Sequence, residues 1–194
     1  CSPDLIRAQT RVLIWSQVAG QDQVNPTRDL VASPSITEIK AGEQQLIRII
    51  RIAPQNTAVE QTYRLLIDEL PSSAQADAQT GLQLLLQYSI PVFIQPTDSI
   101  AMRNGLTLLN QVNFQYQNQQ LIVKNNAKSH IRISELTYIN PNGERIPLIN
   151  GLVGYALAGQ SMRWDIPESK KILPNGKFEA RINSDGLAQM LPIQ

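Results

Sequence analysis

The stretch GLQLLLQYSIPVFI, residues 81–94, is the part of the sequence that decides the fold. An apolar residue stands at every second position from residue 82 to residue 90, which is the period of a β-strand with one apolar face. Strands average about five or six residues, so this apolar face is unusually long. It belongs either to a central core strand or to an exposed sheet edge that aggregates or accepts an added strand. The residues alone leave both interpretations open.

The rest of the chain predicts short strands separated by turn residues. Apolar, β-branched runs such as Ile131–Ile139 and Lys177–Ile182 recur along the sequence, and Pro, Gly and Asn interrupt them. Asn140–Gly143 (NPNG) is a strong tight-turn signal. This rhythm is typical of β-sandwiches. It predicts an all-β protein of two sandwich domains, residues 1–96 and residues 97–194.

The first domain is short of strands for its length. A seven-stranded sandwich needs about 100 residues, and residues 1–96 nearly reach that length, yet only five or six strands are apparent. We therefore expect the first domain to lack its N-terminal strand in this chain.

Composition excludes several functional classes. The 194 residues are 42% hydrophobic and 17% charged, which argues against intrinsic disorder. The net charge of +1 does not indicate the strongly basic character that is typical of nucleic-acid-binding proteins. A single cysteine excludes an internal disulfide, and a single histidine excludes a His-rich metal site. These features favour a binding protein over a metalloenzyme or a nucleic-acid binder.

Catalytic signals are weak. Cys1 and His130 are a nucleophile and a base by residue type, but they fall in different predicted domains, and Cys1 otherwise only begins the sequence. The adjacent carboxylates Asp68 and Glu69 point to opposite faces of a predicted strand, so they cannot act jointly on one bond. No phosphate-binding loop and no dinucleotide fingerprint occurs. We expect no enzyme, no cofactor and no metal.

Several short sequence motifs of this chain, taken in their order and spacing, resemble those of a known protein family. They are Asn25–Leu30 (NPTRDL), Ser33–Ser35 (SPS), Gly42–Arg51 (GEQQLIRIIR), Glu60–Arg64 (EQTYR), Asp68–Pro71 (DELP), Ser89–Pro96 (SIPVFIQP), Gly151–Gly159 (GLVGYALAG) and Arg163–Trp164 (RW). Together they resemble the periplasmic pilus-assembly chaperones of the chaperone–usher pathway. The likeness is greatest to the archaic, Csu-type branch.

This resemblance implies two immunoglobulin-like sandwiches set at an angle with a cleft between them. It implies a periplasmic, non-enzymatic chaperone that binds pilin subunits, stabilises them and delivers them to an outer-membrane usher. Such chaperones complete a subunit's unfinished sandwich with their own edge strand, a β-augmentation called donor-strand complementation. On this chain the donor positions that match are Leu82, Leu84 and Leu86, with Tyr88 and Ile90 as extensions.

The resemblance also implies an anchor for the subunit's C-terminal carboxylate. The best-known branch uses a lysine just after the isoleucine that Ile90 matches, but this chain has Pro91 there. The archaic branch is expected to use a different arginine, and Arg48, Arg51 and Arg64 are the candidates. A guanidinium suits bidentate capture of a carboxylate.

Two alternatives to the chaperone interpretation belong to other classes. The first is an extracellular immunoglobulin-like adhesion or structural binding module, which needs no continuous donor strand. The second and weaker is an N-terminal-nucleophile hydrolase, which requires Cys1 to be a processed terminus. Under the chaperone interpretation, an exposed edge strand also predicts self-association of the free protein.

Overall fold

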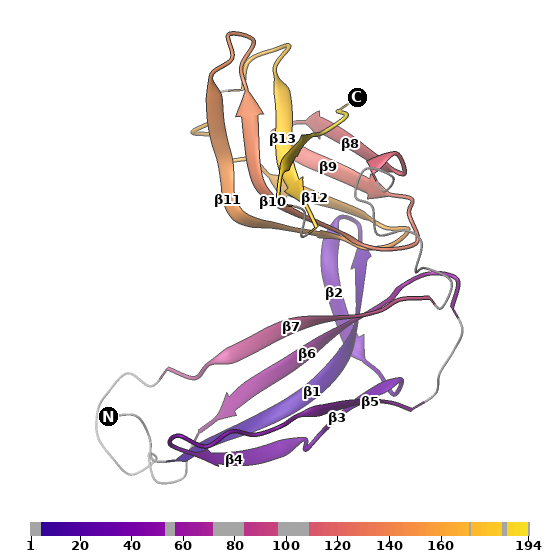
Figure 1. Ribbon diagram of the computed structural model, residues 1–194, viewed down its shortest axis with the longest axis vertical. Coiled ribbons are helices and arrows are strands. Elements are labelled where there is room, and N and C mark those ends of the chain that lie inside the picture. The colour runs from indigo at the N-terminus through magenta and orange to yellow at the C-terminus, as the bar shows by residue number, and fades with distance from the viewer. Residues whose placement is uncertain are drawn as a thin grey trace. The chain divides into compact units, whose positions relative to one another are not determined.

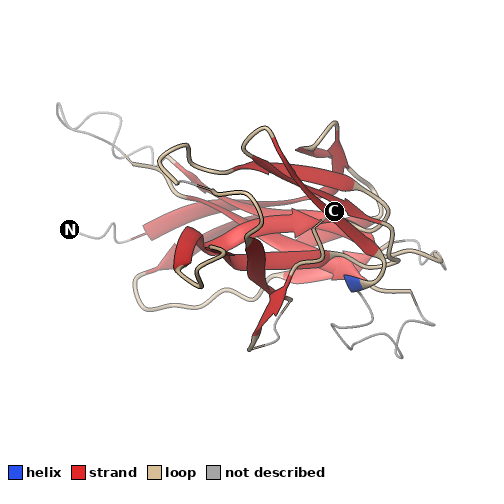
Figure 2. Ribbon diagram, turned by 90° about the horizontal axis from the view of Figure 1, so that it is seen from above, coloured by secondary structure: helices blue, strands red, loops and turns tan. Residues whose placement is uncertain are grey.

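A computed structural model describes residues 5–52, 57–71, 84–96, 109–170, 172–183 and 186–193. Fourteen β-strands, β1 to β14, contain most of these residues (Figure 2). The all-β class expected from the sequence is therefore confirmed. Among the residues described, no helix combines the length and the apolar character needed to cross a membrane.

The first half of the chain forms two sheets (Figure 1). Their strands are β1 (Leu5–Val18), β2 (Gln21–Pro26), β3 (Leu30–Ser33), β4 (Ile36–Lys40), β5 (Arg48–Arg51), β6 (Gln61–Leu70) and β7 (Gln87–Ile94). The larger sheet has the order β2-β1-β6-β7, with β4 also paired to β1. The smaller sheet is the antiparallel pair β3-β5. The strand β7 thus ends the larger sheet.

The second half forms two further sheets. Their strands are β8 (Val112–Gln117), β9 (Gln120–Asn125), β10 (Ile131–Ile139), β11 (Arg145–Ala156), β12 (Ser161–Asp165), β13 (Lys177–Ile182) and β14 (Ala188–Met190). The sheet orders are β11-β10-β13-β14 and β12-β9-β8. The two predicted strands Ile131–Ile139 and Lys177–Ile182 are confirmed as β10 and β13.

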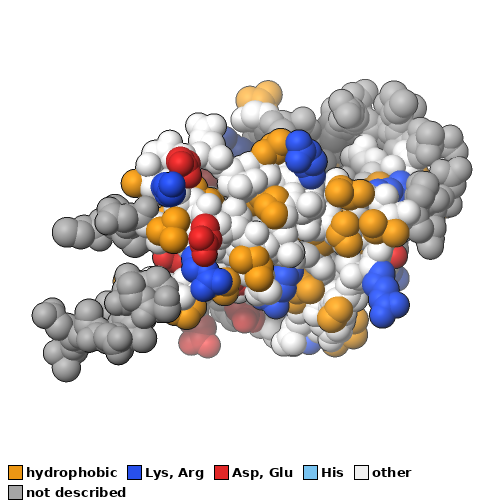
Figure 3. Space-filling view, turned by 90° about the horizontal axis from the view of Figure 1, so that it is seen from below, with side chains coloured by type: hydrophobic (Ala, Val, Ile, Leu, Met, Phe, Trp, Pro, Cys, Tyr) orange, Lys and Arg blue, Asp and Glu red, His pale blue; other side chains and the backbone are white. Residues whose placement is uncertain are grey.

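Burial differs between the two halves. The second half encloses a continuous core of fully buried side chains that includes Phe114, Leu121 and Ile133. The first half buries a smaller group, in which Val12 of β1 pairs with Leu65 of β6. Many of its apolar side chains stay exposed instead, and Figure 3 shows such side chains among charged ones on the surface.

The chain divides into two compact units that do not follow a single cut in the sequence. The first unit contains Cys1–Trp15, Val24–Gln55 and Thr62–Phe93, and the second contains Ser16–Gln23, Asn56–Gln61 and Ile94–Gln194. The tip of the β1–β2 hairpin therefore packs with the second unit. The domain boundary after residue 96 stays a prediction, and nothing in the sequence pattern indicated this exchange.

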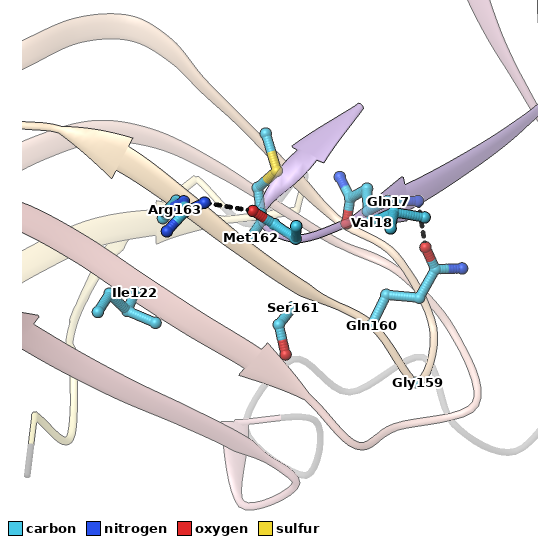
Figure 4. A pocket seen from close by; sticks show the side chains of 10 residues that line it. Gln17, Val18, Ile122, Gly159, Gln160, Ser161, Met162 and Arg163 are labelled. Carbon is cyan, nitrogen blue, oxygen red and sulfur yellow. Dashed lines mark hydrogen bonds between the residues drawn. The ribbon is translucent and has the colours of Figure 1, made fainter. Parts of the chain in front are cut away.

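A buried glutamine fixes the hairpin tip within the second unit. The Gln17 side-chain amide donates hydrogen bonds to the Tyr155 carbonyl (2.6 Å) and to Asp22 Oδ1 (2.9 Å). Its Oε1 accepts from the Leu157 N–H (2.9 Å). The Gln17 backbone N–H donates to Gln160 Oε1, beside an open cavity of ≈ 610 Å³ (Figure 4). Both N–H donors and the oxygen of this mostly buried amide are thus hydrogen-bonded.

We predict that Gln17→Leu destabilises the protein. The substitution leaves the Leu157 N–H and the Tyr155 carbonyl without their side-chain partner, and each such loss costs about 1–3 kcal/mol. Urea unfolding measures the free-energy difference. The matched control Gln115→Leu changes an exposed glutamine of β8 and is expected to have little effect. Equal unfolding free energies for the two variants would contradict the role given to Gln17.

Candidate functional site

The strand that the sequence singled out lies at a sheet edge. In the described part of the chain, β7 pairs with β6 on one side and has no strand on the other. Its backbone N–H and C=O groups along that second side are open to an added strand. Of the two interpretations left open by the residues, the geometry favours the exposed edge over the central core strand.

The apolar side chains of this edge are exposed. Leu84 is 75% exposed, Leu86 56%, Tyr88 57% and Ile90 44%. The remaining predicted donor position, Leu82, lies outside the described residues. Because surface-exposed apolar side chains in a contiguous row mark a binding or aggregation surface, this row is the candidate functional site. We call Leu84–Ile90 the edge segment.

The edge segment is not a regular strand over its whole length, which corrects the expectation of one continuous strand from residue 81. Pairing begins at Gln87, and residues 84–86 are extended chain outside the strand. The reason is the length of the partner: β6 ends at Leu70, and Pro71 follows, which has no N–H to donate. Near this end of β6 the Glu69 N–H donates to the Leu86 carbonyl (2.9 Å).

Two acidic residues near the end of β6 hold the beginning of β7. Asp68 accepts hydrogen bonds from Arg11 Nη2 (2.6 Å) and from the side-chain amide of Gln87. The carboxylate of Glu69 accepts from the Leu86 N–H (3.2 Å). The hydrogen bond from Gln87, and secondarily the Arg11 guanidinium, hold the pKa of Asp68 below its ordinary value. Asp68 and Glu69 therefore act on neighbouring residues of the edge segment, through different contacts.

A stacked aromatic and cationic group lies at the other end of β7. The Trp15 ring is 1% exposed and packs against Phe93, with ring centroids 6.0 Å apart. The Arg64 guanidinium carbon lies 3.6 Å from the centroid of the Trp15 ring. Such cation–π stacking holds a guanidinium in a defined plane. Arg64 is thereby positioned on β6, the strand next to β7.

The three candidate anchor arginines lie on two different sheets. Arg64 lies on β6, whereas Arg48 and Arg51 lie on β5 in the smaller sheet. Burial and the nearby Asp29 carboxylate raise the pKa of Tyr63, and Arg51 opposes this shift. Arg51 is therefore electrostatically engaged with the Tyr63–Asp29 pair.

The residues considered for catalysis have other surroundings. His130 Nδ1 lies 2.7 Å from Glu60 Oε1, and the His130 backbone N–H donates to the same oxygen (3.0 Å). Cys1 lies outside the described residues. In the part of the chain that the structure describes, no three His, Cys, Asp or Glu side chains cluster as a metal site would require.

The sequence indicated the edge segment but not the polar contacts that hold it. The sequence places Asp68 in the DELP motif and on the face opposite Glu69 but predicts no partner for it, and Arg11 and Gln87 carry no signal of their own. Arg11 and Asp68 are 57 positions apart in the sequence, and no helix or strand periodicity relates residues at that separation. The pairing of β1 with β6, which places Gln9 opposite Asp68, is what brings Arg11 within reach.

Residues 5–99 match the model of the PapD N-terminal domain of pili and flagellar-assembly chaperones. No curated protein sequence matches the chain. The matched region contains all seven strands of the first half and the whole edge segment. The first half of the chain is therefore similar to the N-terminal domain of these assembly chaperones.

Solved structures share the fold over almost the whole chain. A structure of the CsuC–CsuE chaperone–tip adhesion subunit complex from archaic Csu pili of Acinetobacter baumannii matches at 24% identity and a TM-score of 0.68, covering 98% of this chain and 85% of the other. The CupB2 chaperone of Pseudomonas aeruginosa matches at 15% identity and a TM-score of 0.61, with 97% and 85% covered. A chain of the Salmonella enterica SafA pilin–SafB chaperone complex matches at 16% identity and a TM-score of 0.61, covering 92% of this chain and 76% of the other. The expected architecture of two immunoglobulin-like domains is thus confirmed.

We predict an acid-dependent stability contribution from Asp68. Its pKa is lowered in the folded protein, so its contribution is present above its ordinary pKa of 3.8 and is lost as pH falls toward the lower folded value. Urea unfolding of the wild type and of Asp68→Asn between neutral pH and pH 2 measures this difference. The two unfolding free energies should converge at low pH, and a pH-independent gap would contradict the prediction.

Proposed function

We propose that this protein is a periplasmic chaperone that binds pilin subunits by donor-strand complementation and delivers them to an outer-membrane usher. The observation that carries the proposal is the edge segment, a row of exposed apolar side chains at the open side of β7. The match to pilus-assembly chaperones over residues 5–99 supports it. The likeness to a chain from an archaic pilus complex supports the archaic branch.

The exposed side chains offer enough binding free energy for this role. Burying one leucine side chain stabilises a complex by roughly 1.5–3 kcal/mol, and Leu84 and Leu86 are both more than half exposed in the free protein. The open backbone of β7 adds hydrogen bonds that orient the incoming strand. A subunit that lacks one strand of its sandwich presents the complementary surface, an open core bordered by an unpaired edge.

Arg64 is the most suitable of the three arginines to anchor the subunit's C-terminal carboxylate. It lies on β6, the direct neighbour of β7, whereas Arg48 and Arg51 belong to the other sheet. Its stacking on Trp15 fixes the plane of the guanidinium, so less entropy is lost when it forms a bidentate pair with a carboxylate.

We predict that Leu84→Arg abolishes subunit capture, because a charged side chain cannot enter an apolar subunit core. The measurement is affinity purification of the full-length tagged protein from the periplasm of its native host, with mass spectrometry of the co-purified proteins. A near-stoichiometric small β-rich pilin is expected with the wild type. The control Leu152→Arg changes a leucine of β11 that is 56% exposed and should retain the pilin. Capture by Leu84→Arg at the wild-type level would refute the donor assignment.

We predict that Arg64→Ala weakens capture of the same pilin by about 10- to 100-fold, the loss expected for hydrogen bonds to a charged group. Arg64→Lys keeps the charge but not the planar fork, so it should restore only part of the affinity. Arg48→Ala and Arg51→Ala serve as controls on β5. Titration of the purified pilin, refolded in the presence of each variant, gives the affinities. A larger loss with either control than with Arg64→Ala would move the anchor to β5.

A further inference from the structure

The run of leucines at the start of the edge segment does not specify its own register. Leu84, Leu85 and Leu86 are consecutive, so a slip by one residue would still present leucine on either face of the strand. Register is strongly specified only where a slip exchanges apolar for polar residues. Another interaction must therefore decide which residue of β7 lies opposite which residue of β6.

Gln87 is the polar residue that breaks this run, and it has one defined contact. Its side-chain amide donates to Asp68 Oδ1, while Arg11 donates to Asp68 Oδ2 through both Nη2 (2.6 Å) and Nε (3.2 Å). The two oxygens of one carboxylate thus face different partners. The Asp68 side chain is 16% exposed, against 48% for Arg11, so the carboxylate is more covered than the guanidinium that supports it.

Three strands meet in this contact. Arg11 comes from β1, Asp68 from β6 and Gln87 from β7. Arg11 pairs with Leu66 and Gln9 with Asp68 in the β1–β6 ladder, so the position of Arg11 beside Asp68 is fixed by backbone pairing. Arg11 of β1 binds Asp68 Oδ2, so Oδ1 is the oxygen that faces a donor from β7. Among residues 84–88, only Gln87 has a side-chain amide that can donate to it.

We propose that Asp68 is a positioning residue that sets the register of the donor strand, with Gln87 as its partner on that strand and Arg11 as its support. Glu69 reinforces the same register at the next residue, since its N–H donates to the Leu86 carbonyl (2.9 Å) and its carboxylate accepts from the Leu86 N–H (3.2 Å). In its consequence for pilin binding, this proposal rests on the proposed function.

The register matters because it decides which leucine meets which part of a subunit. Strand residues are spaced about 3.3 Å apart, so a slip of two residues moves each side chain about 6.6 Å along the open edge while the same face stays apolar. Such a slip keeps the hydrophobic surface and loses the match of individual side chains. The Asp68–Gln87 contact is therefore expected to govern selectivity among subunits more than the capacity to bind apolar surface.

The test uses the full-length free protein and follows amide hydrogen exchange of Glu69 by NMR, because this N–H donates to the Leu86 carbonyl in the observed register, and every change of register must first break that bond. In Gln87→Leu and Asp68→Ala we expect this exchange to accelerate by about tenfold or more, as for local opening. In Gln87→Lys it should stay slow, since an ammonium also donates to the carboxylate. Unchanged exchange in Gln87→Leu, or failure of Gln87→Lys to protect the amide, overturns the proposal.

A matched ion pair provides the control. Arg145 and Glu179 bond across strands of the second unit with side chains that are 57% and 12% exposed, against 48% and 16% for Arg11 and Asp68. Glu179→Ala should leave Glu69 exchange unchanged, and acceleration there would show that the effect is not local to the edge segment.

Pilin capture then separates this proposal from the proposed function. Slow exchange in the wild type and fast exchange in Gln87→Leu support the register role even when no pilin is captured, in which case the proposed function alone fails. Conversely, normal capture together with unchanged exchange in Gln87→Leu refutes the register role and leaves the proposed function intact.

Discussion

The one-sided pairing of β7 is the constraint on which the rest of the first unit depends. A strand inside a sheet satisfies its backbone on both sides, whereas β7 has a strand neighbour only in β6 within the described residues. Its apolar side chains cannot be buried by that neighbour, so they remain in water at a cost proportional to their area. The fold therefore has to keep an exposed apolar surface in a defined position. The contacts around β7 provide this.

The two units meet this demand differently. In the second unit, strands of two sheets enclose a core in which Phe114, Leu121 and Ile133 are fully buried. In the first unit the buried group is small, and the β7 edge is held instead by local contacts: the Trp15–Phe93 packing at one end and the Asp68–Gln87 hydrogen bond at the other. A site that must stay open for a partner is thus fixed by a few specific interactions rather than by extensive burial.

Sequence reasoning succeeded where one residue period decides the outcome. The alternating apolar runs predicted β10 and β13 with their observed bounds, and the run at residues 82–90 indicated the candidate site, part of which lies on the edge strand β7. It failed where the outcome depends on a partner distant in the sequence. The end of β6 at Leu70 leaves Leu84–Leu86 outside the strand, and the buried hydrogen bonds of Gln17 carry the hairpin tip into the second unit. Neither effect has a local signature.

Hydrophobic contacts and hydrogen bonds contribute differently along the edge segment, because only hydrogen bonds depend strongly on direction. Hydrophobic burial is strong but non-directional, so consecutive leucines supply binding free energy without choosing a position. Hydrogen bonds contribute less net free energy, but they require their atoms at defined distances and angles. A donor strand built only of leucines would bind many open cores in several registers. Placing one glutamine at the end of the leucine run, opposite a carboxylate already held by Arg11, gives the strand one position at little cost in apolar surface.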